Sequence, residues 1–224
     1  MEHVHHVKIK VITKITHDVV RIVTEKPLHF TFTPGQAADV SLDKNGWRNQ
    51  KRPFSFTSLP LNDHLEFTIK VYPSHLGVTN QLPTLQKDQE LILHHVFGAI
   101  AYKGEGLFIA GGAGVTPFIS IFRYLQSKSE LGDNKLIFAN KSIADIILEK
   151  EFGKMLDKNF INILSDEMTS GYAHGQITEE FIRPHLPGSH KPVYVCGPPP
   201  MMEAIEKQLE RLGVDGKLIV KEAF

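Results

Sequence analysis

The sequence predicts a two-domain protein in which an antiparallel six-stranded β-barrel is followed by an α/β domain with a parallel sheet. Two observations lead to this prediction. In the first part of the chain, short runs with apolar–polar alternation follow one another with little helical periodicity, which is typical of an antiparallel barrel. After Gly104-Glu105-Gly106, short apolar runs alternate with helical patterns, which favours a parallel sheet covered by helices. We place the domain boundary there, which gives domains 1–103 and 104–224.

The barrel strands are predicted from alternation of apolar residues. The run LEFTIKVY is the clearest case, because Leu65, Phe67, Ile69 and Val71 would share one face. Strand patterns cover Val4–Glu25 (two strands with a turn near Thr16–Asp18), Phe30–Leu42 (two runs separated by Pro34-Gly35), 53–58, 65–72 and Glu90–His95.

The second domain is predicted from alternating strand and helix patterns. Its strands are expected at Leu107–Ala110, Lys135–Asn140, Phe160–Leu164 and Val193–Cys196, and its helices at 117–128, 145–156, 178–186 and 199–211. Nucleotides bind such sheets beyond the carboxyl ends of the strands, where the strand order reverses. We therefore look for a nucleotide site at that edge.

Composition excludes several classes of protein. The 224 residues contain 25 basic and 25 acidic side chains, which removes the usual electrostatic argument for binding nucleic acid or an anionic membrane. The single cysteine, Cys196, excludes an internal disulfide and a four-thiolate iron–sulfur cluster in this chain. Nothing approaches the roughly 20 apolar residues of a membrane-spanning helix, so we expect a cytoplasmic protein. The histidine spacings lack accompanying cysteine or carboxylate ligands, and no metal site is expected.

The stretch LFIAGGAGVTPFIS, Leu107 to Ser120, predicts a strand, a glycine-rich turn and a helix. Proline near the first helical position is a helix start signal. Such a turn presents backbone N–H groups and the positive end of a helix dipole, which suit a pyrophosphate. The alternative is a tight strand-to-helix connection without a ligand.

Three further motifs have both a functional and a structural interpretation. Arg52-Pro53-Phe54-Ser55 combines a cation, a ring and a hydroxyl, or is an edge strand containing proline. Gly77-Val78-Thr79 offers N–H groups at a helix start, or closes a loop onto one helical turn. The third motif is CGPPPM, which begins with Cys196-Gly197-Pro198 and ends at Met201. It either holds a thiol at the end of a strand for a functional role or contains a buried structural cysteine. No basic residue nearby in sequence would activate that thiol as a nucleophile.

Taken together, the order RPFS, LGVTN, GGAGVTPFIS, CGPPPM and a terminal EAF resembles the ferredoxin–NAD(P)⁺ reductase family over essentially the whole chain. The resemblance implies that the barrel binds FAD and that the second domain binds a nicotinamide nucleotide. Leu76 stands where the family often has glycine, which keeps FMN as the alternative to FAD. The residues implied in flavin binding are Arg52, Pro53, Phe54, Ser55, Gly77, Val78, Thr79 and Phe224, and those in nucleotide binding are Gly112, Gly114, Thr116, Pro117, Cys196, Gly197, Pro198 and Met201.

The resemblance also implies roles in hydride transfer. Ser55 would lie near the flavin N5, Cys196 and Glu222 would flank the nicotinamide, and Phe224 would cover the flavin until the nicotinamide displaces it. Ser55, Cys196 and Glu222 would orient and tune the reactants, because hydride transfer needs no general base. Their loss should slow the enzyme without removing the flavin.

The donor and the acceptor are less constrained than the cofactor. Asp166 stands where relatives that use NADPH often have a positively charged residue, and it would repel a 2′-phosphate, so we expect NADH. Lys141 is the counter-argument. The acceptor would be a separate ferredoxin, flavodoxin, cytochrome, oxygenase component or free flavin. Two other interpretations remain: a non-catalytic flavin- or nucleotide-binding subunit of an electron-transfer complex, and a plain binder of ADP-like ligands.

Overall fold

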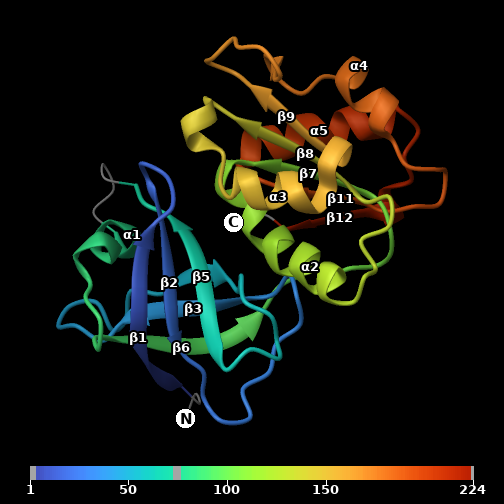
Figure 1. Ribbon diagram of the computed structural model, residues 1–224. Coiled ribbons are helices and arrows are strands. Elements are labelled where there is room, and N and C mark those ends of the chain that lie inside the picture. Colours follow the sequence, from blue (N-terminus) through green and yellow to red (C-terminus); the bar gives the residue numbers. More distant parts are fainter. Residues whose placement is uncertain (1–3, 73–76, 223–224) are drawn as a thin grey trace.

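The N-terminal half is a closed antiparallel barrel, as predicted. In a computed structural model that describes residues 4–72 and 77–222, six strands pair in the order β4-β3-β6-β1-β2-β5 (Figure 1). Residues Phe56 and Phe67 form an antiparallel bridge, and the Thr57 N–H donates to the Glu66 carbonyl at 2.8 Å, so the sheet closes on itself. The strands are β1 (His5–Lys14), β2 (Val19–Glu25), β3 (Ala37–Leu42), β4 (Arg52–Ser55), β5 (His64–Lys70) and β6 (Glu90–Phe97).

Aromatic rings fill the barrel interior. Phe56 is fully buried and lies 4.3 Å from Phe32 and 5.2 Å from Phe67 between ring centroids. The predicted strand around residues 30–33 is wrong: this segment pairs with no strand among the described residues, although Phe30 and Phe32 are buried. Alternate side chains are buried here, as they would be in a strand, but the backbone is irregular. Aromatic rings can pack into the barrel core from such a segment. The short helix α1 (Val78–Gln81) also packs on this core through Val78.

The C-terminal half contains a six-stranded parallel sheet in the order β10-β9-β8-β7-β11-β12. Its strands are β7 (Leu107–Gly111), β8 (Lys135–Asn140), β9 (Phe160–Leu164), β10 (Ala173–His174), β11 (Val193–Cys196) and β12 (Ile219–Glu222). β7 pairs with β8 on one side and β11 on the other, so the strand order reverses at β7. The strands predicted at Lys135–Asn140, Phe160–Leu164 and Val193–Cys196 are confirmed with the same bounds, as β8, β9 and β11. Strand β10 has only two residues, which is too short to predict.

Helices cover both faces of the parallel sheet. α2 (Thr116–Ser127) and α3 (Glu149–Leu156) pack on one face through Phe118, Phe122 and Phe152, while α4 (Glu179–Ile182) and α5 (Pro199–Arg211) pack on the other. The predicted helix 145–156 begins later, at Glu149, because Leu148 adopts a left-handed conformation with φ of 54° that interrupts the helix.

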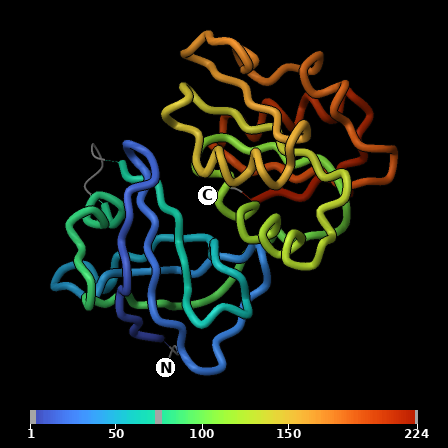
Figure 2. Tube along the Cα trace, viewed as in Figure 1, coloured from blue at the N-terminus to red at the C-terminus, as the bar shows by residue number. Residues whose placement is uncertain are grey.

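The two halves pack against each other beyond the connecting segment. Figure 2 shows the two halves side by side. Val19 of the barrel and Ile100 of the connection are buried in the same apolar cluster as α2. The Tyr194 hydroxyl accepts from the Lys103 N–H at 2.7 Å and donates to the Gly104 carbonyl at 2.8 Å, which anchors the connection to β11. The barrel and the parallel sheet therefore share part of one core.

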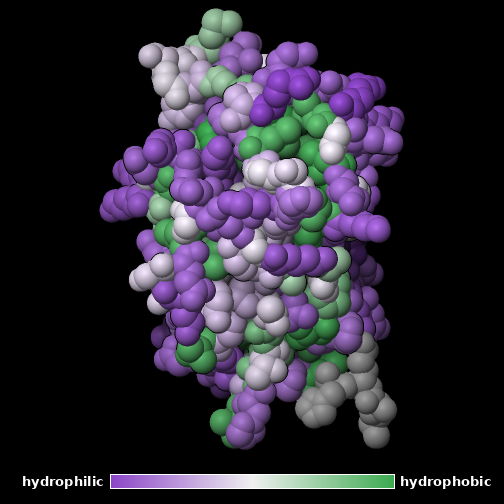
Figure 3. All heavy atoms as spheres, turned by 90° about the vertical axis from the view of Figure 1, so that its right-hand side faces the viewer, coloured by the Kyte–Doolittle hydropathy of each residue, from purple (hydrophilic) through white to green (hydrophobic). Residues whose placement is uncertain are grey.

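One face of the molecule carries both hydrophilic and hydrophobic side chains (Figure 3). On the face that looks to the right of Figure 1, hydrophilic side chains predominate and interrupt smaller hydrophobic areas (Figure 3). Within the described ranges, no helix combines the length and apolar character needed to cross a bilayer.

Candidate active site

The glycine-rich turn lies at the carboxyl end of β7, where the strand order reverses. Residues Gly112–Val115 form a single 3₁₀ turn (η2) that leads directly into α2. Gly112 has φ of 51° and open space where a side chain would stand, so its backbone borders the cleft. Neither the turn nor the first turn of α2 contains an acidic residue or a side-chain cap. No side chain of the turn therefore competes with an anion for its backbone N–H groups, of which the Thr116 N–H already bonds to the Ala113 carbonyl.

Gly114 is required by a close approach of two backbones. A Cβ atom at this position would overlap the carbonyl group of Cys196 and the Cα of Gly197. The turn after β7 thus packs directly on the CGPPPM segment after β11. Gly111 and Gly197 are less strictly constrained, since a Cβ on either would first overlap the end of the flexible Met201 side chain. The sequence motifs at 112–117 and 196–201 form one structural unit.

Ser55 reaches this unit from the barrel. The Thr116 hydroxyl lies 3.4 Å from the Ser55 hydroxyl and donates to the Ala113 carbonyl at 2.9 Å. Both residues are nearly buried, with 5% of Ser55 and 8% of Thr116 exposed. The barrel strand β4 therefore meets the start of α2 at the predicted catalytic serine.

Cys196 and Glu222 are neighbours on adjacent strands. They are paired in the register of β11 and β12, and the Glu222 carboxylate accepts from the Ala99 N–H at 3.2 Å. Burial, and then the negative charge of Glu222, raise the pKa of the Cys196 thiol. The thiol is therefore neutral, which agrees with the expectation that it does not act as a nucleophile. Predicted Phe224 lies outside the described residues.

A cleft of about 680 Å³ opens beside the glycine-rich turn. Its walls come from both halves of the chain: Gly112, Ala113, Asn140, Ser165, Pro198 and Met201 from the parallel-sheet half, and His17, Lys70 and Tyr72 from the barrel half. A cleft of this size at the reversal of strand order is the position where open α/β sheets bind nucleotides.

Asn140 is a cleft residue that the sequence analysis did not single out. It ends β8, only 8% of it is exposed, and neither its side-chain nitrogen nor its side-chain oxygen has a hydrogen-bond partner among the described residues. Buried polar groups without partners are rare in proteins and call for a water or ligand. The only sequence signal was a polar residue at the end of an apolar strand.

The proposed flavin residues occupy the barrel. Arg52 is exposed at the start of β4, and its guanidinium donates to the neighbouring Lys51 carbonyl at 2.7 Å. Phe54 packs in the barrel core with 7% of its surface exposed. α1 starts at Gly77 with no side-chain cap and no acidic residue, and a Cβ on Gly77 would meet open space. An exposed guanidinium and an uncapped N–H group suit the anionic part of a flavin nucleotide.

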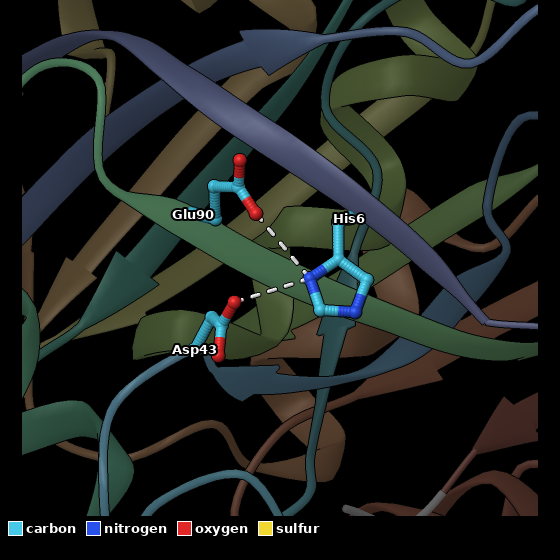
Figure 4. A group of neighbouring side chains, drawn as sticks. All are labelled: His6, Asp43 and Glu90. Carbon is cyan, nitrogen blue, oxygen red and sulfur yellow. Dashed lines mark ion pairs between the residues drawn. The ribbon is translucent and has the colours of Figure 1, made fainter.

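Two histidine–carboxylate groups have the composition of a metal site, one outside the cleft and one in its wall. His6 Nδ1 is 3.2 Å from Asp43 Oδ2 and 3.3 Å from Glu90 Oε2 on the barrel surface (Figure 4). His17 lies between Asp18 and Asp145 at the edge of the cleft. A basic side chain already pairs with each group, Arg48 with Asp43 and Lys70 with Asp18. Each group combines residues from segments that are distant in the sequence, so histidine spacing did not reveal them.

Family comparisons agree with this geometry. Residues 1–95 match the family described as FAD-binding domain, and residues 108–207 match the family described as oxidoreductase NAD-binding domain. The chain belongs to the ferredoxin–NAD(P)⁺ reductase-type family. FAD and a nicotinamide nucleotide are the cofactors of this reductase family, and the predicted fold class is confirmed.

The chain is similar to curated proteins that are named as reductases or reductase components. It is 30% identical to NADH-cytochrome b5 reductase 2 of Mycosarcoma maydis, over 75% of this chain and 52% of that protein. It is 29% identical to the propane 2-monooxygenase reductase component of Mycolicibacterium goodii, over 93% of this chain and 64% of that protein. The chain thus spans about half to two thirds of the length of these relatives.

A solved structure supports the fold. The flavohem-like FAD/NAD-binding domain of nitric oxide dioxygenase from Vibrio cholerae O1 biovar El Tor aligns with a TM-score of 0.87 and 18% identity, covering 100% of this chain and 99% of that one. At this identity the likeness concerns the fold alone.

Replacing Gly114 by alanine tests the close approach of the two motifs. Because the new Cβ would overlap the Cys196 carbonyl, the turn must shift away from β11, and we expect nucleotide binding to weaken about tenfold or more. Titration of the purified flavoprotein with NAD⁺ or NADP⁺ measures this. Gly153→Ala in α3 is the control, since a Cβ there meets nothing within 4 Å. Unchanged binding in Gly114→Ala would contradict the packing described here.

Replacing Asn140 by leucine, which has a similar shape, tests the unpartnered amide. Removing two buried polar atoms without partners should raise the free energy of unfolding of the ligand-free protein by about 1 kcal/mol. That gain corresponds to a rise in melting temperature of about 2–4 °C. We also expect weaker nucleotide binding. A lower melting temperature would mean that an ordered water already satisfies the amide in the free protein.

Proposed function

We propose that this reductase oxidises NADH and passes the electrons through FAD to a separate acceptor, such as a ferredoxin, flavodoxin, cytochrome or oxygenase component. The observation that carries the proposal is the contact of Ser55 on barrel strand β4 with Thr116 at the start of α2. Thr116 directly follows the turn that packs on Cys196, which is paired with Glu222 on the neighbouring strand. The flavin-binding part would span 1–103 and the nucleotide-binding part 104–224.

Each group of residues has a separate task in this proposal. Arg52, Gly77, Val78 and Thr79 would hold the flavin pyrophosphate, with Pro53 shaping the strand and Phe54 against the ring system. Gly112, Gly114, Thr116 and Pro117 would hold the nucleotide pyrophosphate at the start of α2. Gly197, Pro198 and Met201 would close the cleft on the other side, and Phe224 would cover the flavin face.

When bound, FAD and the nicotinamide nucleotide would supply the hydride-transfer and electron-transfer chemistry. The chain's residues bring the two reactants to contact distance, about 3–3.5 Å, and keep water out. Ser55, which is nearly buried, would orient the flavin through its hydroxyl. The neutral Cys196 thiol and the Glu222 carboxylate would orient the nicotinamide at the ends of β11 and β12.

The preference for NADH rests on the charge at the end of β9. Ser165 lines the cleft and donates to Asp166 at 2.6 Å, while the Asp166 N–H donates to the Lys141 carbonyl at 2.9 Å. The Asp166 carboxylate is thus held beside the cleft, where it would repel a 2′-phosphate. The names of several relatives, which specify NADH, also support this choice.

An absorbance spectrum of the purified protein, followed by anaerobic addition of NADH or NADPH, tests the function. We expect bound flavin that NADH bleaches faster than NADPH does. Faster bleaching by NADPH would leave the reductase but reverse the donor. Bound flavin that neither nucleotide reduces would favour the non-catalytic subunit, and a protein that cannot take up FAD would overturn the proposal.

Replacing Asp166 by serine tests the donor preference. Loss of the carboxylate should raise the ratio of kcat/KM for NADPH to that for NADH about tenfold, equivalent to ~1.4 kcal/mol. Steady-state kinetics with a dye acceptor measure this ratio. Asp63→Ser, which removes a carboxylate that is 91% exposed on the barrel, should leave the ratio unchanged. An equal ratio in Asp166→Ser and the unmodified protein would show that the charge plays no part.

A further inference from the structure

One face of α2 binds the barrel through three polar side chains placed at successive turns. Thr116 contacts Ser55, the Ser120 hydroxyl accepts from the Gly35 N–H at 2.9 Å, and Arg123 donates to the Thr57 carbonyl at 2.7 Å. The spacing of four and then three residues aligns these side chains on a helix. Helix α2, which begins at the glycine-rich turn, therefore contacts the flavin-binding barrel at residues 116, 120 and 123.

Arg123 makes the most contacts of the three. Its Nη1 donates to Glu66 Oε1 at 2.6 Å on the barrel strand β5, and its Nε and Nη2 donate to the Glu151 carboxylate on α3 at 2.5 and 3.0 Å. The planar guanidinium thus joins a barrel strand to two helices of the nucleotide domain. A lysine could not make these contacts together, because it lacks the fork of donors.

Glu66 is the buried centre of this arrangement. Only 5% of its side chain is exposed, and it also accepts from Arg21 Nε at 2.7 Å and from the Thr57 hydroxyl at 2.8 Å. Burial alone would raise the pKa of Glu66, but the charge and hydrogen bonds of Arg123 lower it overall. A carboxylate this buried holds its partners in place, since an unpaired buried charge is strongly unfavourable. Arg21 and Arg123 share this carboxylate, but only Arg123 crosses between the domains.

We propose that Arg123 is a positioning residue for hydride transfer. Through its contact with Glu66, it fixes the glycine-rich turn at 112–115 relative to the flavin-binding barrel. The proposal rests on the proposed function. Arg123 lies seven residues after Thr116, about 10 Å along a rigid helix, so a shift at one end moves the other. Because transfer requires contact at about 3–3.5 Å, a displacement of this helix lowers the rate steeply.

The test compares Arg123→Met with Arg21→Met. Both remove a guanidinium bound to Glu66, but only the first breaks the contact between domains. Anaerobic stopped-flow mixing of the flavoprotein with NADH separates the limiting rate of flavin bleaching from the apparent Kd for NADH. In Arg123→Met we expect the limiting rate to fall about 10- to 100-fold, with FAD content and Kd within about twofold of the unmodified protein. Arg21→Met should keep the full rate.

Amide hydrogen exchange of the FAD-bound protein supplies a readout independent of activity. Exchange should rise in the first turns of α2 and near Thr57 in Arg123→Met, and stay unchanged there in Arg21→Met. If Arg123→Met does not fold, Glu66→Gln decides, and the same fall in limiting rate is expected.

The proposal fails if the rate of flavin bleaching is unchanged in these interface variants, or if Arg21→Met is slowed as much as Arg123→Met. It also fails if only the Kd for NADH changes. These outcomes differ from failure of the proposed function, in which the unmodified protein itself carries no reducible flavin.

Discussion

The contact between α2 and the barrel is the constraint on which the site depends. α2 begins where the nucleotide turn ends, and its side chains at 116, 120 and 123 all contact the barrel. The apolar side of the same junction includes Val19 and Ile100. Because polar and apolar contacts act on one helix, the two binding regions have a defined relative position, which a reaction at contact distance requires.

Close backbone packing explains why the site is rich in glycine and proline. The turn after β7 touches the segment after β11 so closely that Gly114 has no room for a side chain. Pro198 lies immediately before α5, and prolines 199 and 200 form its first residues, so the segment after Cys196 is fixed before the helix begins. Together these two strand ends form a stiff wall beside the cleft, while backbone N–H groups remain available to an anion.

Electrostatics at the centre favour orientation over acid–base chemistry. The buried Cys196 thiol stays protonated because burial and Glu222 oppose its ionisation. Glu222 itself bonds to the Ala99 N–H in the segment that joins the two halves. Cys196 is thus a neutral thiol and Glu222 is held in place by a backbone N–H, which suits a reaction whose chemistry resides in the cofactors.

The sequence by itself determined the two sheets, most strand positions and the order of the motifs, since alternation and helical spacing are local consequences of which side chains are buried. Local signals failed at Phe30 and Phe32, whose side chains are buried although their backbone pairs with no described strand. They also failed at Leu148, whose left-handed conformation delays the start of a helix. Only the tertiary structure decided that Ser55 meets Thr116, that Asn140 lies unpartnered in the cleft, and that Arg123 binds Glu66. Arg123 and Glu66 are 57 residues apart, and no local pattern specifies such a pair, because folding alone brings these side chains together.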